Sequence, residues 1–337
     1  MKDSSHTGGS SSRCPGDQVM SGCITREAFE DLAGCVKEIF NVHTVQLGSG
    51  HFRGRLDFIA GKGMLLYREN YPIRTHLQGE LLGNRFGLSI PLRSEYGRFL
   101  GEPVDDTRTA SSVSGESFDY MMEAGFEQMI LLIDHGKLLK LAEQAALSSA
   151  ALEALLKGRK GKVLNTNAHA VARTRKTFSR MLHSVRQGTM NMSADDFEKV
   201  IFETLLPVID GGHYHLDRNS AIVTVRRSMD CACAINGPIR ISDLCMALNI
   251  SPRTLELAFR MVMGMTPHVF FRKRRLNMAY MELMRADPRE SRVTDIALSL
   301  GFSELGRFSV QYRELFGESP SETLRRSRSC AVTVPAW

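Results

Sequence analysis

Two groups of side chains that could bind the edges of DNA bases lie near the carboxyl end of the chain. The first group is Arg253, Glu256 and Arg260, and the second is Arg307 and Gln311. A guanidinium group can bind guanine through two hydrogen bonds, a carboxylate can accept from cytosine, and an amide can pair with adenine. Residues three or four apart share one face of a helix, so each group could act together only if a helix carries it.

A repeated segment supplies the two helices. Residues 242–251 align with residues 294–303 at an offset of 52, and after one inserted residue the match continues at an offset of 53. In each copy a short helix is expected to end at Asn249 or Gly301, which tolerate the left-handed backbone of a tight turn. Helix, tight turn and second helix form the helix-turn-helix arrangement, whose second helix enters the major groove. The predicted motifs cover about 241–264 and 293–317.

The starts of the helices carry hydroxyl side chains that can cap them. Such a side chain accepts a hydrogen bond from a free backbone N–H of the first turn. Thr266, followed by Pro267, is expected to begin a connecting helix that continues to about Arg285. Its nineteen residues at ~1.5 Å each would span roughly 28 Å, close to the ~34 Å between successive major grooves on one DNA face. The expected caps inside the repeats are Ser242, Ser251, Thr294 and Ser303.

Each polar residue around the motifs receives an expected role. Arg253 is the strongest candidate for reading a guanine, while Glu256 either accepts from cytosine or stabilises the helix start through the dipole. The run 272–275 covers all faces of a helix, so only part of it can contact DNA and the rest is expected to anchor the subdomains. The predicted DNA-binding residues are Ser251, Pro252, Arg253, Glu256, Arg260, Arg272, Ser303, Glu304, Leu305, Gly306, Arg307, Gln311 and Arg313.

Positive charge is concentrated in the same region. Residues 237–328 contain 15 Lys and Arg against 10 Asp and Glu, whereas the whole chain has a formal net charge of +6. This distribution favours a polyanionic partner, double-stranded DNA. A solvated basic surface remains the alternative on charge alone.

The amino-terminal half reads differently. Ten of the 28 glycines lie between Gly48 and Gly101, separated by short apolar or alternating runs. Short strands with Gly turns are typical of a β-sandwich or small barrel, which can enclose one small ligand. The expected strands lie in Val42–Leu47, Leu56–Ile59, Met64–Tyr67, Phe86–Pro91, Phe118–Met122 and Met129–Ile133.

Helical spacing is expected on both sides of this β region, in Thr25–Phe40, Lys137–Leu156, Ala168–Gln187 and a helix after Ser193. The apolar stripes of the last two either face the core of their own domain or form a homodimer seam through about 168–209. The predicted organisation is a disordered tail at 1–24, an effector-sensing and dimerisation domain at 25–209, a linker at 210–220, a DNA-binding domain at 221–328 and a tail at 329–337.

Other patterns indicate little chemistry. His213 and His215 have a metal-like spacing but lack a matching carboxylate, and Cys231 and Cys233 diverge by ~100° per residue on a helix. We expect no catalytic residue, metal ligand or cofactor. Seven scattered cysteines fit reduced thiols in a cytoplasm, and no apolar run is long enough to span a membrane.

The carboxyl-terminal residues resemble the AraC/XylS family of bacterial transcription regulators. Within that family the likeness is greatest to the ethanolamine-utilisation regulators, although ethanolamine itself is not carried over. The sequence departs from the family pattern at Leu257 and Val310, where basic residues are frequent. The matching run is Ser251-Pro252-Arg253-Thr254-Leu255, Phe259, Gly264, Pro267, Arg275-Leu276, Ala279, Asp295-Ile296-Ala297, Gly301-Phe302, Phe308, Tyr312-Arg313, Phe316-Gly317 and Pro320.

The resemblance implies an α+β chain, with a β-rich, cupin-like amino-terminal sensor that carries a helical hairpin and an all-α double helix-turn-helix domain. It also implies a regulator that activates transcription through RNA polymerase in response to a small-molecule effector, which the sequence does not name. Three alternatives stay open: a constitutive DNA binder without a ligand, a DNA-repair methyltransferase and a metalloenzyme carrying the same module. The two enzymes would need a zinc-clustered cysteine set or convergent His and Glu ligands.

Overall fold

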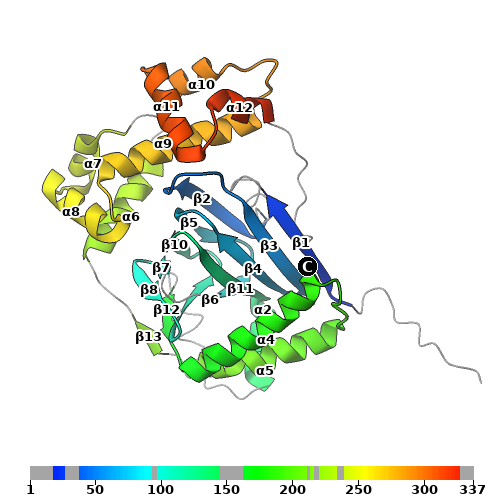
Figure 1. The fold of residues 1–337 in the computed structure, drawn as a ribbon. Helices are drawn as coiled ribbons and strands as arrows, with labels where there is room; N and C mark the ends of the chain where they lie inside the picture. The colour runs from blue at the N-terminus through cyan, green and yellow to red at the C-terminus, as the bar shows by residue number, and fades with distance from the viewer. Residues whose placement is uncertain are drawn as a thin grey trace, which may run out of the picture.

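Two antiparallel β-sheets form the amino-terminal half of the protein, and helices cover both outer faces (Figure 1). The computed structural model describes residues 18–26, 38–92, 97–144, 162–210, 213–215, 220–233 and 239–326. Five of the six expected apolar runs lie wholly in strands, and the sixth, Val42–Leu47, extends one residue beyond its strand. The strands are β1 (Met20–Arg26), β2 (Phe40–Gln46), β3 (Gly54–Gly61), β4 (Met64–Tyr71), β5 (Thr75–Leu81), β6 (Arg85–Pro91), β7 (Gly97–Phe99), β8 (Glu102–Val104), β9 (Arg108–Val113), β10 (Ser117–Met122), β11 (Phe126–Asp134), β12 (Lys162–Asn165) and β13 (His213–His215).

The larger sheet has the strand order β1-β3-β4-β11-β6-β9-β12-β13, and the smaller has the order β2-β5-β10-β7-β8. Their facing side chains alternate with outward ones along each strand, as the period of two requires. Leu65 and Tyr67 of the larger sheet meet Phe118 and Tyr120 of the smaller in one apolar core. The predicted α+β class, with a β-rich amino-terminal domain and an all-helical carboxyl-terminal domain, is confirmed.

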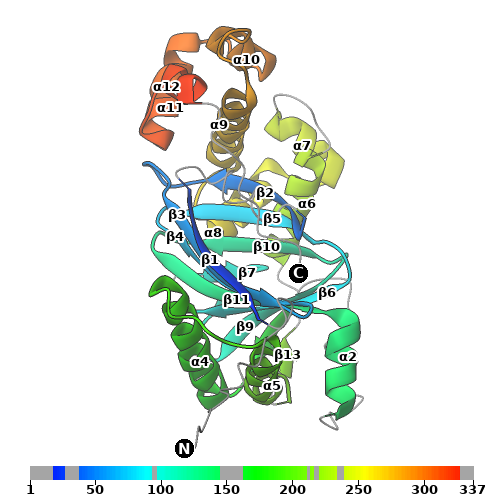
Figure 2. The same ribbon diagram turned by 90° about the vertical axis from the view of Figure 1, so that its right-hand side faces the viewer.

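The helices fall into two groups (Figure 2). Three lie in the amino-terminal half and seven build the carboxyl-terminal half of the described chain. None of the described helices combines the length and the hydropathy needed to cross a membrane. They are α2 (His135–Gln144), α4 (Ala168–Arg186), α5 (Ala194–Asp210), α6 (Ser220–Cys233), α7 (Ile241–Leu248), α8 (Pro252–Met263), α9 (Pro267–Arg285), α10 (Val293–Ser299), α11 (Leu305–Phe316) and α12 (Pro320–Arg326).

Helices α4 and α5 form the expected hairpin and pack on the outer face of the larger sheet (Figure 1). Phe178 of α4 and Phe197 and Ile201 of α5 share a core with Ile59 and Leu131 of the strands. The apolar stripes therefore face the core of their own domain. Because these side chains are already buried, a dimer through this segment would have to use the outer surfaces of the two helices.

Three boundaries differ from the sequence prediction. The predicted disordered tail at 1–24 contains the start of β1, whose backbone pairs with β3 from Met20 to Arg26. The predicted helix Thr25–Phe40 instead ends β1 at its first residues and begins β2 at its last, while 27–37 lie outside the described residues. The predicted linker at 210–220 contains β13, which pairs with β12. In each case backbone pairing with a distant strand, which no local pattern records, decides the conformation.

The domain that the two sheets form, called the barrel below, docks on the connecting helix α9 through the edge strand β2 (Figure 1). The backbone N–H of Gln46 donates to Oδ1 of Asn277 at 2.8 Å, and Nδ2 of Asn277 donates to the carbonyl of Gln46 at 3.2 Å. Asn277 is only 2% exposed. A buried amide must keep its partners because an unpaired polar group in the interior costs free energy.

Further contacts tie the barrel to the ends of two other helices. Nη2 of Arg74 donates to the carbonyl of Met263 at 2.8 Å, at the last residue of α8. Nε2 of Gln46 donates to the carbonyl of Leu315, near the end of α11, at 2.8 Å. The barrel therefore holds α8, α9 and α11 in one arrangement. Val45, Leu47 and Met121 of the barrel share a hydrophobic core with Val225, Phe259 and Phe270 of the helices.

Replacing Asn277 with Ala should lower the free energy of unfolding of the full chain by ~1–3 kcal/mol, because both backbone groups of Gln46 lose their buried partner. Urea unfolding of the full chain measures this loss. Asn41→Ala is the matched control, since Asn41 lies on β2, the strand that contains Gln46, and makes an exposed side-chain hydrogen bond to Glu80. An equal loss in both variants would contradict the importance of the buried pair.

Candidate nucleic-acid interface and ligand cavity

The first predicted motif forms the expected helix, tight turn and helix from α7 and α8. Asn249 adopts the left-handed conformation (φ 52°, ψ 50°) between them. Oγ of Ser251 accepts from the backbone N–H of Thr254 at 3.1 Å, so the predicted cap of α8 is confirmed. The predicted cap at Ser242 is wrong: α7 begins two residues earlier than that prediction requires, and Arg240 occupies the cap position without a side-chain hydrogen bond.

The second motif repeats this arrangement with α10 and α11, and Gly301 has the positive φ of 79° that the turn requires. Two predicted caps are wrong here. Arg292, not Thr294, precedes α10, and Glu304, not Ser303, precedes α11. The carbonyl of Arg292 already accepts the first helical hydrogen bonds, so Thr294 lies inside the helix. Sequence signals fix a helix end only to within one or two residues.

Helix α8 buries one face and exposes the other. Leu255 and Phe259 are fully buried, as predicted. The predicted DNA-binding residues Pro252, Arg253, Glu256 and Arg260 are all exposed, together with Ser251. Oε1 of Glu256 accepts from Nε of Arg260 at 3.0 Å and from Nη2 at 2.9 Å. An exposed pair of this kind contributes little stability, so both groups can exchange this contact for a base or phosphate.

Helix α11 is arranged in the same way. Phe308 and Tyr312 are buried, whereas Arg307 is exposed and lies 3.8 Å from the carboxylate of Glu304. A Cβ atom built on Gly306 meets no atom within 4 Å, so this surface leaves room for a close approach. Of the other predicted residues on or beside this helix, Ser303 and Arg313 are exposed and Leu305 and Gln311 are half-buried.

The basic run on α9 divides as its helical spacing requires. Arg272 lines a groove beside α11, together with Ser303, Glu304, Arg307 and Gln311. Nζ of Lys273 donates to the carbonyl of Leu47 in the barrel, and burial lowers its pKa. Cζ of Arg275 lies 5.5 Å from the centroid of the Phe302 ring, and burial also lowers its pKa. Arg272 and Arg275 therefore both line the groove, and Arg275 also contacts the Phe302 ring, while Lys273 makes its contact with the barrel.

Large apolar residues are exposed at repeat-equivalent positions that the sequence reading did not assign to a site. Leu257 of α8 is 54% exposed, and Val310, which is 53 residues later, is 58% exposed. Each lies three or four residues from exposed arginines and therefore shares their face. Met246 and Leu298, the pair at an offset of 52, are also exposed. Comparison of the two copies for matching apolar positions outside the core would have found both pairs.

Comparison with known proteins agrees with this geometry. A family model described as a helix-turn-helix domain matches residues 244–326. The probable thc operon regulatory protein of Rhodococcus erythropolis is 38% identical over 88 residues, 26% of each chain. The XylDLEGF operon transcriptional activator 1 of Pseudomonas putida is 38% identical over 89 residues, again 26% of each chain. The solved structure of a probable AraC family transcriptional regulator from Rhodopseudomonas palustris is 39% identical, with 32% of this chain and 99% of that chain covered and a TM-score of 0.29.

The helix-turn-helix domain of the chain is similar to the DNA-binding domains of AraC/XylS-type operon regulators. The match lies in the helix-turn-helix domain, and it spans about a quarter of the length of the two curated relatives. The similarity to known proteins thus concerns the AraC-type domain. The role of the barrel has to be argued from the residues of the barrel itself.

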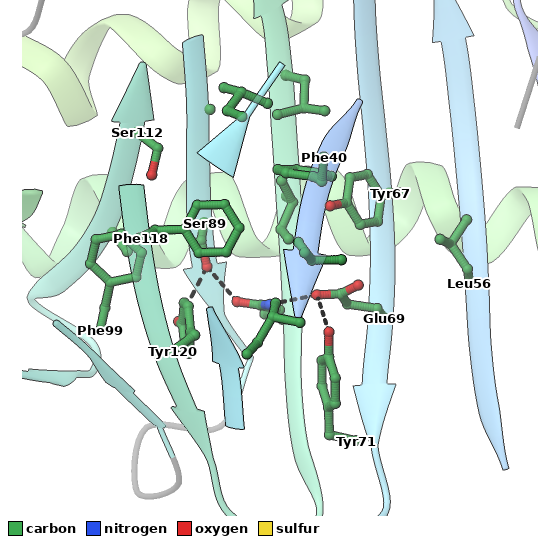
Figure 3. Close-up of a pocket in the computed structure, with 18 residues that line it drawn as sticks. Phe40, Leu56, Tyr67, Glu69, Tyr71, Ser89, Phe99, Ser112, Phe118 and Tyr120 are labelled. Carbon is green, nitrogen blue, oxygen red and sulfur yellow. Dashed lines mark hydrogen bonds between the residues drawn. The ribbon is translucent and has the colours of Figure 1, made fainter. Parts of the chain in front are cut away.

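The barrel contains a cavity between its two sheets (Figure 3). Its wall is almost entirely apolar and rich in aromatic rings, and β2, β5 and β10 form the side nearest the AraC-type domain. Ligand pockets are commonly apolar with a few polar groups that orient the ligand. The aromatic residues of the wall are Phe40, Tyr67, Tyr71, Phe99, Phe118 and Tyr120.

One carboxyl group lies in this wall. Glu69 is 7% exposed, and its Oε1 accepts from the hydroxyl of Tyr71 at 2.9 Å and from Nε2 of Gln128 at 2.6 Å. Burial raises the pKa of Glu69 to about 7, against the opposing effect of these two hydrogen bonds. Burial also raises the pKa values of Tyr67, Tyr71 and Tyr120, so these hydroxyls stay neutral.

The sequence reading left the effector-binding residues unknown. One signal was present: Tyr67, Glu69 and Tyr71 alternate along β4 and therefore point to the same face of the sheet. A carboxyl between two tyrosines of one face is unusual if that face is solvated. The other walls of the cavity come from distant strands, which the sequence alone could not bring together.

Metal chemistry receives no support from the described residues, among which no group of three His, Cys, Asp or Glu side chains could hold an ion. His213 and His215 lie on β13 at the edge of the larger sheet. Of the described cysteines, Cys23 is exposed, Cys231 is half-buried and Cys245 is buried. Cys14, Cys35, Cys233 and Cys330 lie where no side chain is described.

The raised pKa of Glu69 predicts a pH-dependent stability. Because the folded state holds this proton up to about pH 7 and the unfolded state releases it near 4.5, rising pH between these values should lower the free energy of unfolding by about 3 kcal/mol. Urea unfolding of the full chain at pH 5 and pH 8 measures the change.

The variant Glu69→Gln isolates this contribution, because it removes the titrating group and keeps the shape. The free energy of unfolding of this variant should therefore fall less between pH 5 and pH 8 than that of the unmodified chain. Glu80→Gln, at an exposed hydrogen bond on β5, is the control that should show no such difference. A pH dependence that is the same with and without the Glu69 carboxyl would contradict the assignment.

Proposed function

We propose that the chain is a sequence-specific DNA-binding regulator of transcription, an activator that responds to a small molecule bound in the barrel cavity. The observation that carries the proposal is the pair of repeat-related recognition helices, α8 and α11, each exposing arginine residues away from its buried face. The nineteen residues of α9 between the two motifs correspond to roughly 28 Å, near the ~34 Å repeat of the major groove. One chain would place both helices in adjacent groove segments.

The cavity and the recognition helices share one sheet. Along β10, Tyr120 faces the cavity and Met121 belongs to the core shared with the AraC-type domain. Along β2, Val42 and Val45 are divided in the same way. We propose that an occupied cavity shifts the population of arrangements that this sheet permits to α8 and α11.

The names of the relatives support activation of an operon, because the Pseudomonas putida proteins are named transcriptional activators. On this basis we propose RNA polymerase as a protein partner. A homodimer through the outer surfaces of α4 and α5 is proposed as well, and the chain is proposed to act without catalysis.

Selection from a random duplex pool with the full chain tests the function. We expect enrichment of a bipartite sequence whose two halves lie about one helical turn apart, with affinity that falls steeply as salt rises. If the enriched pool binds no more tightly than random competitor at physiological ionic strength, the proposal is wrong.

Arg307→Ala should weaken binding to the selected duplex by about 1–3 kcal/mol and relax discrimination at one base position, because a bidentate contact to guanine would be lost. Gel-shift titration against single-base variants of the duplex measures both effects. Arg98→Ala, at an exposed arginine on β7, is the control and should bind as the unmodified chain does. Uniform weakening on all base variants would make Arg307 a phosphate contact.

A further inference from the structure

The chemistry of the cavity wall narrows the class of ligand that it can hold. Among the described residues that line it, Glu69 is the single group that carries a charge near neutral pH, and none of them is Lys, Arg or His. A carboxylic acid ligand would bring a second anion beside this carboxyl without a compensating cation, which low polarity makes costly. The wall therefore disfavours anions.

Hydrogen bonds fix the Glu69 carboxylate and leave one of its oxygens available. Ser89 Oγ donates to Oε1 of Gln128 at 2.5 Å, which orients the Gln128 amide so that its Nε2 donates to Oε1 of Glu69. Tyr71 donates to the same oxygen. Both of these hydrogen bonds go to Oε1 of Glu69, in the wall of the cavity. Oε2 is therefore the oxygen that a donor group of a ligand could reach.

Aromatic rings line the cavity beside Glu69. Tyr67 and Tyr71 lie on either side of Glu69 on the same strand, and Phe40 lies near it from the smaller sheet (Figure 3). Phe118 and Tyr120 of the smaller sheet lie farther along the same wall, beside Ser89. The faces of such rings attract cations, and the attraction is strongest where water is excluded. A carboxylate within an aromatic wall is suited to an ammonium group.

We propose that the barrel cavity binds a small apolar primary amine, with its ammonium group donating to Oε2 of Glu69 and its hydrocarbon part among the aromatic rings. The cavity volume of about 70 Å³, where ~10–15 Å³ holds one water molecule, limits the ligand to a few heavy atoms. The regulatory meaning of this binding rests on the proposed function. The binding itself does not, because it is measured without DNA.

The ionisation state of Glu69 sets the pH dependence of ammonium binding. The ionisable groups that face Glu69 are Tyr67 and Tyr71 from β4 and Tyr120 from β10, and all three stay neutral because burial raises their pKa values. The lining residues of β3, β6 and β11 bring no ionisable group. Binding an ammonium ion requires the ionised carboxyl, so affinity rises with pH up to the pKa of Glu69, about 7, and is level above it.

The test compares butylamine, 1-butanol and butanoate, which have similar hydrocarbon parts and differ in charge. Calorimetric titration of each into the full chain at pH 6 and pH 8 gives the dissociation constants. Butylamine should bind about tenfold more tightly at pH 8 than at pH 6, and more tightly than the alcohol at pH 8. Butanoate should not bind measurably at pH 8.

Two variants locate the effect. Glu69→Gln should lose the preference for butylamine over 1-butanol and the pH dependence, while retaining the binding of the alcohol. Glu80→Gln should behave as the unmodified chain. The pH dependence of the unmodified chain provides a second readout if Glu69→Gln does not fold.

Three results would overturn the proposal: no binding of butylamine, binding of butanoate that is as tight as that of butylamine at pH 8, or a preference for butylamine over 1-butanol that survives Glu69→Gln. A separate measurement concerns the effector role. If butylamine binds as expected but leaves the affinity for the selected duplex unchanged, the ligand class holds and the regulatory role of the cavity fails.

Discussion

The docking of β2 on α9 depends on the reciprocal hydrogen bonds between the Gln46 backbone and the Asn277 amide. An edge strand has backbone groups without a neighbouring strand, and here one buried side chain satisfies both groups of Gln46. Because α9 joins the two helix-turn-helix motifs, this contact attaches the barrel to the helical domain between the two motifs. Arg74 and the Gln46 side chain then reach the ends of α8 and α11.

The smaller sheet gains two roles from the same geometry. Alternation sends Val42 and Tyr120 into the barrel and Val45 and Met121 toward the helices. The smaller sheet thus lies between the cavity and the helices of the carboxyl-terminal domain. Close-packed interiors transmit displacements because they contain few voids that could absorb them.

Local patterns were sufficient for much of the fold. The duplicated motif, the left-handed turn at Asn249, the cap at Ser251 and the start of α9 after Thr266 all follow from residues within a few positions of one another. The apolar runs of the barrel also matched strands, since their period of two survives in any sheet. Exposure of Arg253 and the other predicted residues of α8 followed from helical spacing alone.

The sequence predictions that were wrong concern segments whose conformation depends on partners distant in the sequence. Strand β1 forms because β3 offers it backbone partners, and β13 forms because β12 does. The apolar faces of α4 and α5 could be predicted from the spacing of their residues. Only the tertiary structure showed that the larger sheet, and not a second chain, covers these faces.

The sequence by itself determined the repeated helix-turn-helix unit, its basic character and the β-rich half, because these reside in local spacing and composition. The tertiary structure alone decided that Glu69 is buried among aromatic rings from both sheets and that Asn277 meets Gln46, 231 residues away. The physical reason is that burial and the pairing of polar groups depend on which distant segments meet, and a one-dimensional pattern carries no record of that meeting.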